Sequence, residues 1–349
     1  MVLMGKKALI IFLFLLAAAT VYAGPLPLPP AGQMYHGVYP GGAYQEQDVI
    51  TTAELTSYQT SVGKKAVWVY FSDDWFRGRG FPNETAGWIR DNGSIPFIRL
   101  MLRSSDQMNT LEATFTLDRI ASGEFDADLR AWFQSAREFK TPLLVEYGTE
   151  VNGQWFSWNG VWNGGTAGVD KFKNAYRHII QLARDQQADN LTWVFHVNYN
   201  DDPATGWNRF ENYYPGDEWI DWLGVSVYGE QTPDGLLNFS FRTLMDRVYA
   251  RLAKLSPGKP VAVLEFGVTS LNTLVNQANW ADDALKDLTR PRWPRVVGFA
   301  WWNEAWHNYD EPAYDTDMRV EDNPALAKVF RKRIAENGKV LDKFPLPQN

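Results

Sequence analysis

The 349-residue chain contains no cysteine. Without thiols it can form no disulfide bond and can carry no lipid on a cysteine. Its stability must therefore come from a packed core, and with 45 % hydrophobic residues the chain is long enough to bury a large one. This composition favours one large domain over several small disulfide-stabilised modules.

Histidine is scarce as well. The chain has four, His36, His178, His196 and His307, and none of them forms a close pair in the sequence. Metal hydrolases commonly bind zinc through closely spaced histidines. We therefore expect no catalytic metal and no other cofactor.

Positive charge is in deficit, with 34 Lys and Arg against 41 Asp and Glu and a net charge of −7. An acidic protein of this kind is not expected to bind nucleic acid or an anionic membrane. The chain also carries 16 Trp and 15 Tyr, an unusually large number. Aromatic rings pack against the C–H faces of sugars, so this surplus favours a neutral carbohydrate ligand.

A long apolar run occurs once, at the amino terminus. Lys6 and Lys7 precede the apolar segment Ala8–Ala19, and small residues follow it. This order predicts a signal peptide over residues 1–23, with a single membrane anchor as the alternative. Residues 24–34 are rich in proline and are predicted to be an extended spacer. We expect a secreted protein, extracellular or periplasmic, with no membrane association after cleavage.

Eight apolar runs typical of buried strands recur along the chain, and residues with helical spacing fill most intervals between them. The predicted strands are Tyr35–Tyr39, Ala66–Phe71, Ile95–Leu102, Pro142–Tyr147, Leu191–His196, Trp222–Tyr228, Pro260–Phe266 and Val296–Trp302. Such a pattern predicts an α/β fold, a single-domain (β/α)₈ TIM barrel over residues 35–340, which we expect to be a monomer. The fifth unit is the weakest, because residues 198–217 resemble a long loop with a short helix at best.

The fourth predicted strand ends in an unusual loop. After Gly148 the chain places Glu150 at the carboxyl end of the strand, followed by Asn152, Trp155 and Trp158. Active sites of TIM barrels lie at this end of the strands. A carboxylate beside aromatic residues there suits a ligand with apolar faces and many hydroxyls. The structural alternative is a solvated glutamate with its tryptophans folded back onto the barrel.

A second carboxylate, Glu265, follows the apolar residues of the seventh strand. Burying it is costly unless it has a partner, so it either closes the barrel mouth through a salt bridge or takes part in chemistry. Hydrolysis of a glycosidic bond needs two carboxyl groups, one as an acid and one to attack or stabilise the oxocarbenium carbon. We therefore predict that Glu150 and Glu265 face each other as the catalytic pair.

Three segments carry a resemblance to glycoside hydrolase family 26, which contains many β-mannanases. The stretch from Thr149 to Trp158 resembles that family's strand-four signature, His-Glu-x-Asn-Gly-x-Trp followed by a second Trp. Residues 264–267 resemble its nucleophile segment, and residues 213–224 are similar to the segment that leads into its sixth strand. Gly37-Val38-Tyr39 and Ile95-Pro96 also fit the family, so the resemblance runs over essentially the whole chain that follows the predicted signal peptide and preserves order and spacing.

The resemblance implies a retaining double displacement with Glu150 as the acid/base and Glu265 as the nucleophile. Tyr228 would donate a hydrogen bond to Glu265, which would favour the charged form of that carboxyl. Trp155 would line the subsite of the reacting sugar. Strand alternation sends Trp301 and its neighbour Trp302 to opposite sides, and the family pattern favours Trp301 as the second ring at that subsite.

Two further residues of the loop, Asn152 and Trp158, complete the predicted substrate-binding set, although Trp158 could equally be loop packing. The sequence departs from the family pattern at Thr149, where His is usual, and at Ser226, where Asp is usual. Within the predicted strands, Glu146 and Arg99 are expected to form a buried pair beneath the site. His196 is expected either to contact sugar or to be satisfied in the core.

These observations predict a secreted retaining endo-β-glycosidase acting on a plant-type or microbial β-polysaccharide, with β-1,4-mannan first among the substrates. A β-glucanase or xylanase of the same family is the alternative enzyme, because the two departures border the sugar site. A catalytically silent carbohydrate-binding barrel is the alternative outside enzymes. It would keep the tryptophans but would not need both glutamates.

Overall fold

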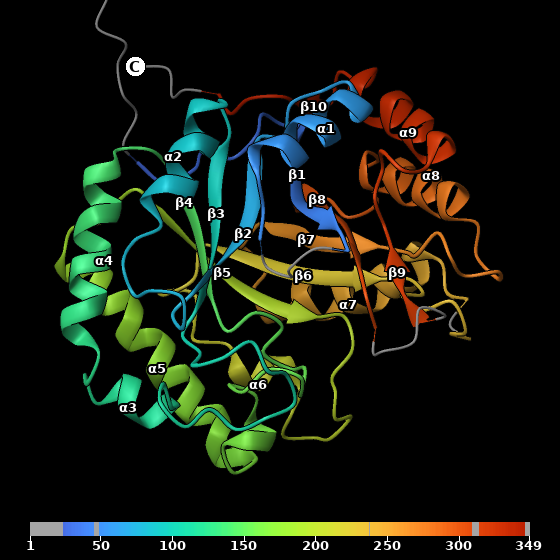
Figure 1. Ribbon diagram of the computed structural model, residues 1–349. Coiled ribbons are helices and arrows are strands. Elements are labelled where there is room, and N and C mark those ends of the chain that lie inside the picture. Colours follow the sequence, from blue (N-terminus) through green and yellow to red (C-terminus); the bar gives the residue numbers. More distant parts are fainter. Residues whose placement is uncertain (1–23, 45–48, 237, 309–313, 346–349) are drawn as a thin grey trace, which may run out of the picture.

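Eight parallel strands close into a barrel in the computed structural model, which describes residues 24–44, 49–236, 238–308 and 314–345. The strands pair in chain order, and the ring closes because β1 (Met34–Ala43) pairs with both β2 (Trp68–Asp74) and β8 (Val296–Trp306). Helices surround the barrel on its outside (Figure 1). The chain is therefore a (β/α)₈ TIM barrel, as predicted.

The remaining elements alternate along the chain as this fold requires. The other barrel strands are β3 (Ile95–Met101), β4 (Leu143–Tyr147), β5 (Leu191–Asn198), β6 (Trp222–Tyr228) and β7 (Val261–Gly267). The helices are α1 (Thr52–Val62), α2 (Asn83–Asp91), α3 (Leu117–Ala121), α4 (Asp126–Phe139), α5 (Thr166–Asp185), α6 (Phe210–Tyr213), α7 (Phe241–Leu255), α8 (Gln277–Leu288) and α9 (Pro324–Phe330). Each of the eight predicted strands is present, with ends that differ by a few residues.

The fifth unit has the expected irregular form. Its segment between β5 and β6 contains the four-residue α6 and is otherwise loop. After β8 the chain forms α9, which continues directly into a π-helical turn over Arg331–Ala335. Two short strands were not predicted, β9 (Thr316–Asp317) antiparallel to β8 and β10 (Val340–Leu341) parallel to β1. Strands of two residues are too short to show a period in the sequence.

The interior of the barrel is filled at its amino-terminal end by aromatic rings. Tyr35 meets Trp68 edge-on at 6.1 Å between ring centroids and stacks on Trp222 at 6.5 Å. The indole of Trp68 lies so close to β1 that a Cβ on Gly37 would be 2.0 Å from its ring nitrogen. Glycine at this position therefore makes room for the floor on which the site is built.

Residues 24–34 are not a free spacer, and that prediction is wrong. Leu26 is buried and packs with the cluster inside the barrel, and its N–H donates to Thr192 Oγ1 at 2.9 Å. The Tyr35 hydroxyl donates to the carbonyl of Pro27 at 2.6 Å. A proline-rich segment has few donors of its own, but its side chains and carbonyls can still dock against a core. Residues 1–23, the predicted signal peptide, lie outside the described residues.

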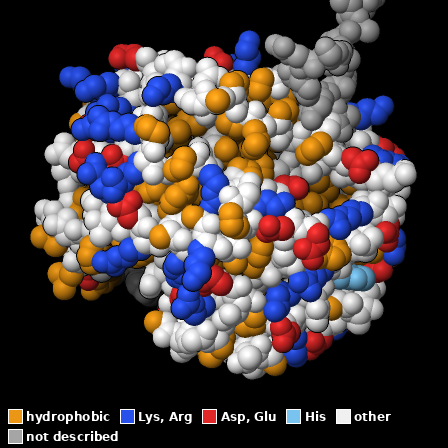
Figure 2. All heavy atoms as spheres, turned by 180° about the vertical axis from the view of Figure 1, so that it is seen from behind, with side chains coloured by type: hydrophobic (Ala, Val, Ile, Leu, Met, Phe, Trp, Pro, Cys, Tyr) orange, Lys and Arg blue, Asp and Glu red, His pale blue; other side chains and the backbone are white. Residues whose placement is uncertain are grey.

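Within the described part of the chain, no helix combines the length and apolar character needed to cross a membrane. Figure 2 shows the face opposite to the view of Figure 1, where basic and acidic side chains are interspersed around hydrophobic areas. A mixture of both signs on a surface favours solubility over attraction of a polyanion.

Candidate active site

A cavity of about 620 Å³ opens at the carboxyl ends of the barrel strands. Both predicted catalytic residues, Glu150 and Glu265, line it. Most of the other lining side chains are aromatic or charged: Trp155, Phe156, Tyr199, Tyr228, Trp302, Trp306, Arg77, Arg99, Arg103, Asp106, Asp202, Glu230 and Glu304. A cavity of this size with aromatic walls and convergent polar groups suits an oligosaccharide segment.

The loop after β4 holds Glu150 in an uncommon backbone conformation. Gly148 has φ 76° and Glu150 has φ 46°, in the left-handed region that non-glycine residues rarely adopt. The indole N–H of Trp155 donates to Glu150 Oε2 at 2.7 Å. A Cβ on Gly153 would lie 2.2 Å from the Trp155 ring, so glycine allows the ring to turn back onto the carboxylate. The loop therefore fixes one carboxylate and one aromatic face together.

Glu265 reaches the cavity through a β-bulge. Ser226 of β6 pairs with Glu265, whereas the preceding Val225 pairs with Val263, so β7 contains one extra residue at Leu264. Leu264 packs inside the barrel, while Val263 packs on the outside. The extra residue turns Glu265 to the inside as well, where it lines the cavity. Bulges near active sites commonly re-aim a side chain in this way.

Two tyrosines hold the carboxylate of Glu265. Tyr228 donates to Oε2 at 2.8 Å, as the sequence predicted. The Tyr70 hydroxyl lies 3.3 Å from Oε1 and 2.5 Å from Glu146 Oε1. Tyr70 was missed because a tyrosine inside an apolar strand is usually core. Which side of β2 faces the inside of the barrel, and hence that Tyr70 points inward, is known only from the three-dimensional structure.

Burial, followed by the negative charge of Glu150, raises the pKa of Glu265 to about 7. The charges of Arg99 and His196 act in the opposite direction. The predicted hydrogen bond from Tyr228 is present and favours the charged form of Glu265, but burial outweighs it, so the pKa of this carboxyl is raised. Repulsion by the carboxylate of Glu150 therefore contributes to the raised pKa of Glu265, after burial.

The raised pKa of Glu265 has a consequence for stability. Below pH 4.5, its ordinary value, the carboxyl is neutral in both the folded and the unfolded chain. As the pH rises towards 7 the unfolded chain releases the proton first, so the free energy of unfolding falls by about 3 kcal/mol. Glu265→Gln removes this loss. We expect the variant to gain about 3 kcal/mol relative to wild type between pH 4.5 and pH 8 in chemical denaturation.

Glu138→Gln, on the solvent-exposed part of α4, is the control for this measurement. It should change the free energy of unfolding by less than about 0.5 kcal/mol at either pH. A constant difference between Glu265→Gln and wild type across this pH range would contradict the raised pKa.

A buried ion pair lies beneath the two carboxylates. His196 Nδ1 is 3.0 Å from Glu146 Oε2, and both residues are fully buried. Burial opposes both charges, but the charge and the hydrogen bond of the partner, together with other charged neighbours, outweigh it, so the pKa of His196 is raised and that of Glu146 is lowered. Arg99 also lowers the pKa of Glu146. The ion pair beneath the site therefore joins Glu146 to His196, whereas the prediction named Arg99, which acts on Glu146 through its charge and lines the cavity.

The two departures from the family pattern contact opposite ends of this ion pair. The hydroxyl of Thr149 donates to Glu146 Oε1 at 2.5 Å, and Ser226 Oγ is 2.7 Å from His196 Nε2. Both residues are fully covered and do not line the cavity. They can therefore influence the sugar only through the ion pair and the residues above it.

Trp302, not Trp301, faces the cavity, so the prediction for Trp301 is wrong. Trp301 lies outside the barrel, where it packs against Phe266 and Phe330 and donates its indole N–H to the carbonyl of Met318 at 2.7 Å. Trp302 stacks on Tyr39 with 3.8 Å between ring centroids. The alternation of β8 could have decided between them, because Gly298 faces the Trp68 ring inside the barrel and Trp302 is four residues further.

The prediction that Trp158 and Asn152 bind substrate is also wrong. Trp158 is 2 % exposed, stacks on Phe156 and donates to the carbonyl of Thr149 at 2.9 Å, so it is loop packing. The Asn152 side chain is fully buried and bonds only to the neighbouring loop. A loop that carries polar and aromatic residues must also hold itself together, and the sequence does not separate that need from ligand binding.

Trp155 and Trp158 form a matched pair for mutation. Trp155→Ala removes a half-buried ring that donates to Glu150, the predicted acid/base, so we expect kcat/KM to fall about 10- to 100-fold. The free energy of unfolding should change by no more than about 1 kcal/mol. Trp158→Ala empties a buried site and should cost about 3–5 kcal/mol of stability. Activity per folded molecule and denaturation curves check both, and the opposite pattern would reverse the assignment of the two rings.

Among the described residues, no group of three or more His, Asp or Glu side chains is arranged to hold a metal ion. The cavity instead offers carboxyl groups, tyrosine hydroxyls, indole N–H groups and arginines. Such groups can transfer protons, attack an electrophilic carbon and bind hydroxyls.

The known proteins that this chain resembles are glycoside hydrolases. The family model described as Glycosyl hydrolase family 26 matches residues 102–260. Endoglucanase H of Acetivibrio thermocellus is 25 % identical over 334 residues, which cover 95 % of this chain and 34 % of that protein. A mannan endo-1,4-β-mannosidase of Bacillus subtilis is 23 % identical over 231 residues, covering 62 % of this chain and 57 % of the relative. The chain thus spans about a third of the first relative and somewhat more than half of the second.

The fold has matches among solved structures. A GH26 β-mannanase from Bacteroides ovatus superimposes with a TM-score of 0.62 at 16 % identity, covering 89 % of this chain and 90 % of that one. At this identity the likeness concerns the fold.

Proposed function

We propose that the chain is a member of glycoside hydrolase family 26, whose family model it matches over residues 102–260, and a retaining endo-β-glycosidase that hydrolyses a β-linked polysaccharide by double displacement. Glu265 attacks the anomeric carbon and forms a glycosyl-enzyme, while Glu150 protonates the departing oxygen. Glu150 then acts as the base for the water that releases the product.

One observation carries this proposal: two carboxyl groups line the same cavity, where burial and, after it, the charge of Glu150 raise the pKa of Glu265. Burying two carboxyl groups in one cavity destabilises the fold, so such a pair is expected mainly where a reaction uses both groups. A silent sugar-binding barrel would need the aromatic walls alone. The roles follow from their positions. Glu265 is held from below by Tyr228, and Glu150 sits in a loop at the cavity, where a leaving group can reach it.

β-1,4-Mannan is the first substrate that we propose, in keeping with the mannanases among the relatives. A β-glucan is the second, because the relative that matches 95 % of the chain is an endoglucanase. The choice between them concerns the C2 hydroxyl of the reacting sugar, axial in mannose and equatorial in glucose. Thr149 and Ser226 lie beneath that subsite without lining the cavity, so the aromatic and arginine residues above them would make the distinction.

The test is hydrolysis of mannan, galactomannan, mixed-linkage β-glucan and xylan by the purified protein, with product sizes followed over time. We expect oligosaccharides of intermediate length to appear early from one of the first three polymers. Release of monosaccharide alone would contradict endo action. Binding of a polymer without any hydrolysis would favour a carbohydrate-binding barrel.

Secretion and a monomeric state are part of the proposal. Residues 1–23 have the composition of a cleaved signal, and the net charge is acidic. The mass of protein recovered outside the cytoplasm should correspond to a chain that begins near Gly24. Light scattering of that protein should give the mass of a single chain. An intact amino terminus in a membrane fraction would favour the anchor instead.

A further inference from the structure

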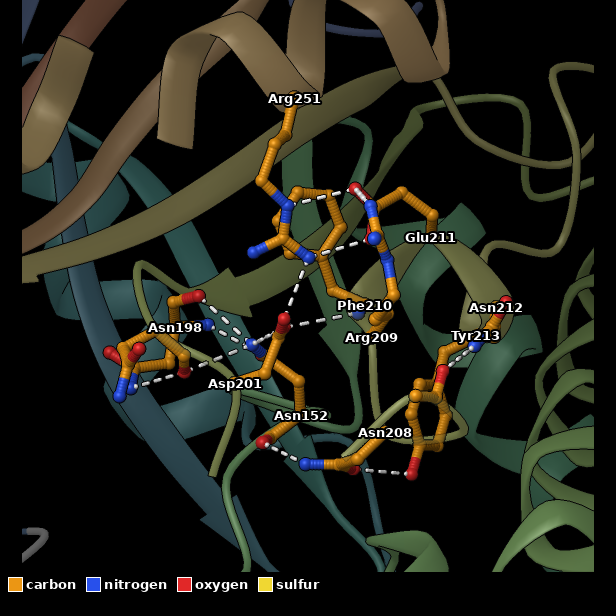
Figure 3. A network of polar contacts seen from close by, with 12 residues as sticks. Asn152, Asn198, Asp201, Asn208, Arg209, Phe210, Glu211, Asn212, Tyr213 and Arg251 are labelled. Atoms are coloured by element: carbon orange, nitrogen blue, oxygen red, sulfur yellow. Dashed lines mark hydrogen bonds and ion pairs between the residues drawn. The ribbon is translucent and has the colours of Figure 1, made fainter. Parts of the chain in front are cut away.

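The loop that carries Glu150 is tied to a helix on the outside of the barrel through a continuous polar network (Figure 3). It starts at Asn152, two residues after Glu150. Asn152 Nδ2 contacts the carbonyls of Asn198 and Asn200 at 3.0 and 3.1 Å, and its Oδ1 accepts the backbone N–H of Asn198 at 2.8 Å. The loop after β5 therefore contacts both the nitrogen and the oxygen of the Asn152 side-chain amide.

The backbone of Asn152 is held as well. Its carbonyl accepts hydrogen bonds from the Asp202 N–H and from Asn208 Nδ2, both at 2.9 Å. The Gly153 N–H in turn donates to the carbonyl of Glu150 at 2.7 Å. These contacts hold the turn in which Glu150 keeps its left-handed φ of 46°. A rare backbone conformation persists only where several interactions of the surrounding structure hold it in place.

Asp201 connects the network to helix α7. Its Oδ1 accepts from Asn152 Nδ2 at 2.9 Å and from the Phe210 N–H at 3.2 Å. Its Oδ2 accepts from Arg251 Nη2 at 2.8 Å. One carboxylate thus joins the loop after β4, the short helix α6 and the helix α7.

Arg251 is itself firmly held. It makes two hydrogen bonds to Glu211, of 2.8 and 2.6 Å, and its guanidinium lies 3.9 Å from the centre of the Phe210 ring. Burial alone would raise the pKa of Glu211, but the hydrogen bonds from Arg251 and Arg209 lower it to about 2. The side chain of Arg251 is 26 % exposed, so the pair is less screened than one on the open surface.

We propose that Arg251 is a positioning residue for the acid/base Glu150, acting through Asp201 and Asn152. The inference rests on the proposed function, because it assigns Arg251 to the same reaction. Without Arg251, Asp201 loses its ion pair. The hydrogen bond between Asp201 and Asn152 is then held less firmly. Glu150 then leaves the place from which it can protonate the departing oxygen, and an error of about 1 Å in a catalytic group can cost about 100-fold in rate.

The test uses Arg251→Met, which keeps an apolar stem over Phe210 and removes the charge. Two substrates are compared by kcat/KM, which reports the first step: the hydrolysed polysaccharide and a matching dinitrophenyl glycoside, whose leaving group needs no proton. We expect kcat/KM to fall about 10- to 100-fold on the polysaccharide and less than about 3-fold on the activated glycoside. Arg251→Lys should recover part of the loss, because it restores the charge without the planar fork.

The matched control is Arg242→Met on the same helix. Arg242 forms a two-bond ion pair with Asp287, of 2.7 and 2.8 Å, which joins α7 to α8 instead of to the loop of Glu150. It should leave both kcat/KM values unchanged. If Arg251→Met does not fold, Asp201→Asn replaces it, since the amide oxygen can still accept from Asn152 while the charge is lost.

Equal losses on both substrates, or the same losses in Arg242→Met, would overturn the positioning role. So would full activity of Arg251→Met and of Asp201→Asn on the polysaccharide. A wild-type protein that hydrolyses none of the four polymers would instead overturn the proposed function, so the two failures are distinguishable.

Discussion

Glu265→Ala should lose at least about 10⁴-fold in kcat/KM on the polysaccharide and on the dinitrophenyl glycoside alike. The nucleophile forms the first covalent bond, so an activated leaving group cannot compensate for its removal. Glu265 is 5 % exposed and lies against Tyr228 and Tyr70, so its truncation empties a confined place at the base of the cavity. Azide added to this variant could only attack from the vacated side and would give a glycosyl azide of inverted configuration.

The control for this result is Tyr228→Phe, which keeps the ring and removes the hydrogen bond to Glu265. It should lower kcat/KM by about 10- to 100-fold and leave the mechanism unchanged. Substantial turnover of either substrate by Glu265→Ala, with retention of configuration, would show that another group is the nucleophile.

Glu150→Ala should separate the two substrates. Hydrolysis of the polysaccharide should fall by about 10²- to 10⁴-fold, because its sugar leaving group needs a proton. The first step on the dinitrophenyl glycoside should be nearly unchanged, so the glycosyl-enzyme accumulates after a burst. Azide should then accelerate turnover and give a product of retained configuration, since it replaces the water that Glu150 activates.

Trp155→Phe is the informative companion of Glu150→Ala. It retains an aromatic face and loses the N–H that donates to Glu150 Oε2. A smaller loss with the same dependence on leaving group is expected. If Glu150→Ala lost activity equally on both substrates and azide had no effect, Glu150 would not be the acid/base.

The strands could be predicted because their apolar runs are dictated by burial on both faces of a parallel barrel. The two glutamates could be predicted because a carboxylate at the end of such a run is costly to desolvate and is seldom kept there without a function. The β-bulge at Leu264 was not predictable in the same way, since an extra residue leaves the apolar pattern of β7 intact. Glu265 nevertheless depends on that bulge to face the cavity.

The wrong predictions have a common cause in packing between distant segments. Trp158 and Asn152 occupy the same loop as Trp155, and only their partners distinguish a ring that stacks on Phe156 from one that lines the cavity. The proline-rich segment at 24–34 has a disordered composition, yet Leu26 enters the barrel end. The pKa of Glu265 depends on how strongly burial outweighs the hydrogen bond from Tyr228. The residues next to Glu265 in the sequence do not indicate how deeply its carboxyl is buried.

Trapping the covalent intermediate tests the double displacement most directly. The protein would be incubated with a dinitrophenyl 2-deoxy-2-fluoro-β-glycoside of the sugar released in the substrate screen, then digested and examined by mass spectrometry. Fluorine slows both steps, and the good leaving group lets the first one proceed. We predict one label per chain, on the peptide that contains Glu265, with loss of activity in parallel. A label on Glu150, or complete inactivity towards the reagent by a protein that hydrolyses polysaccharide, would contradict the assignment of Glu265 as the nucleophile.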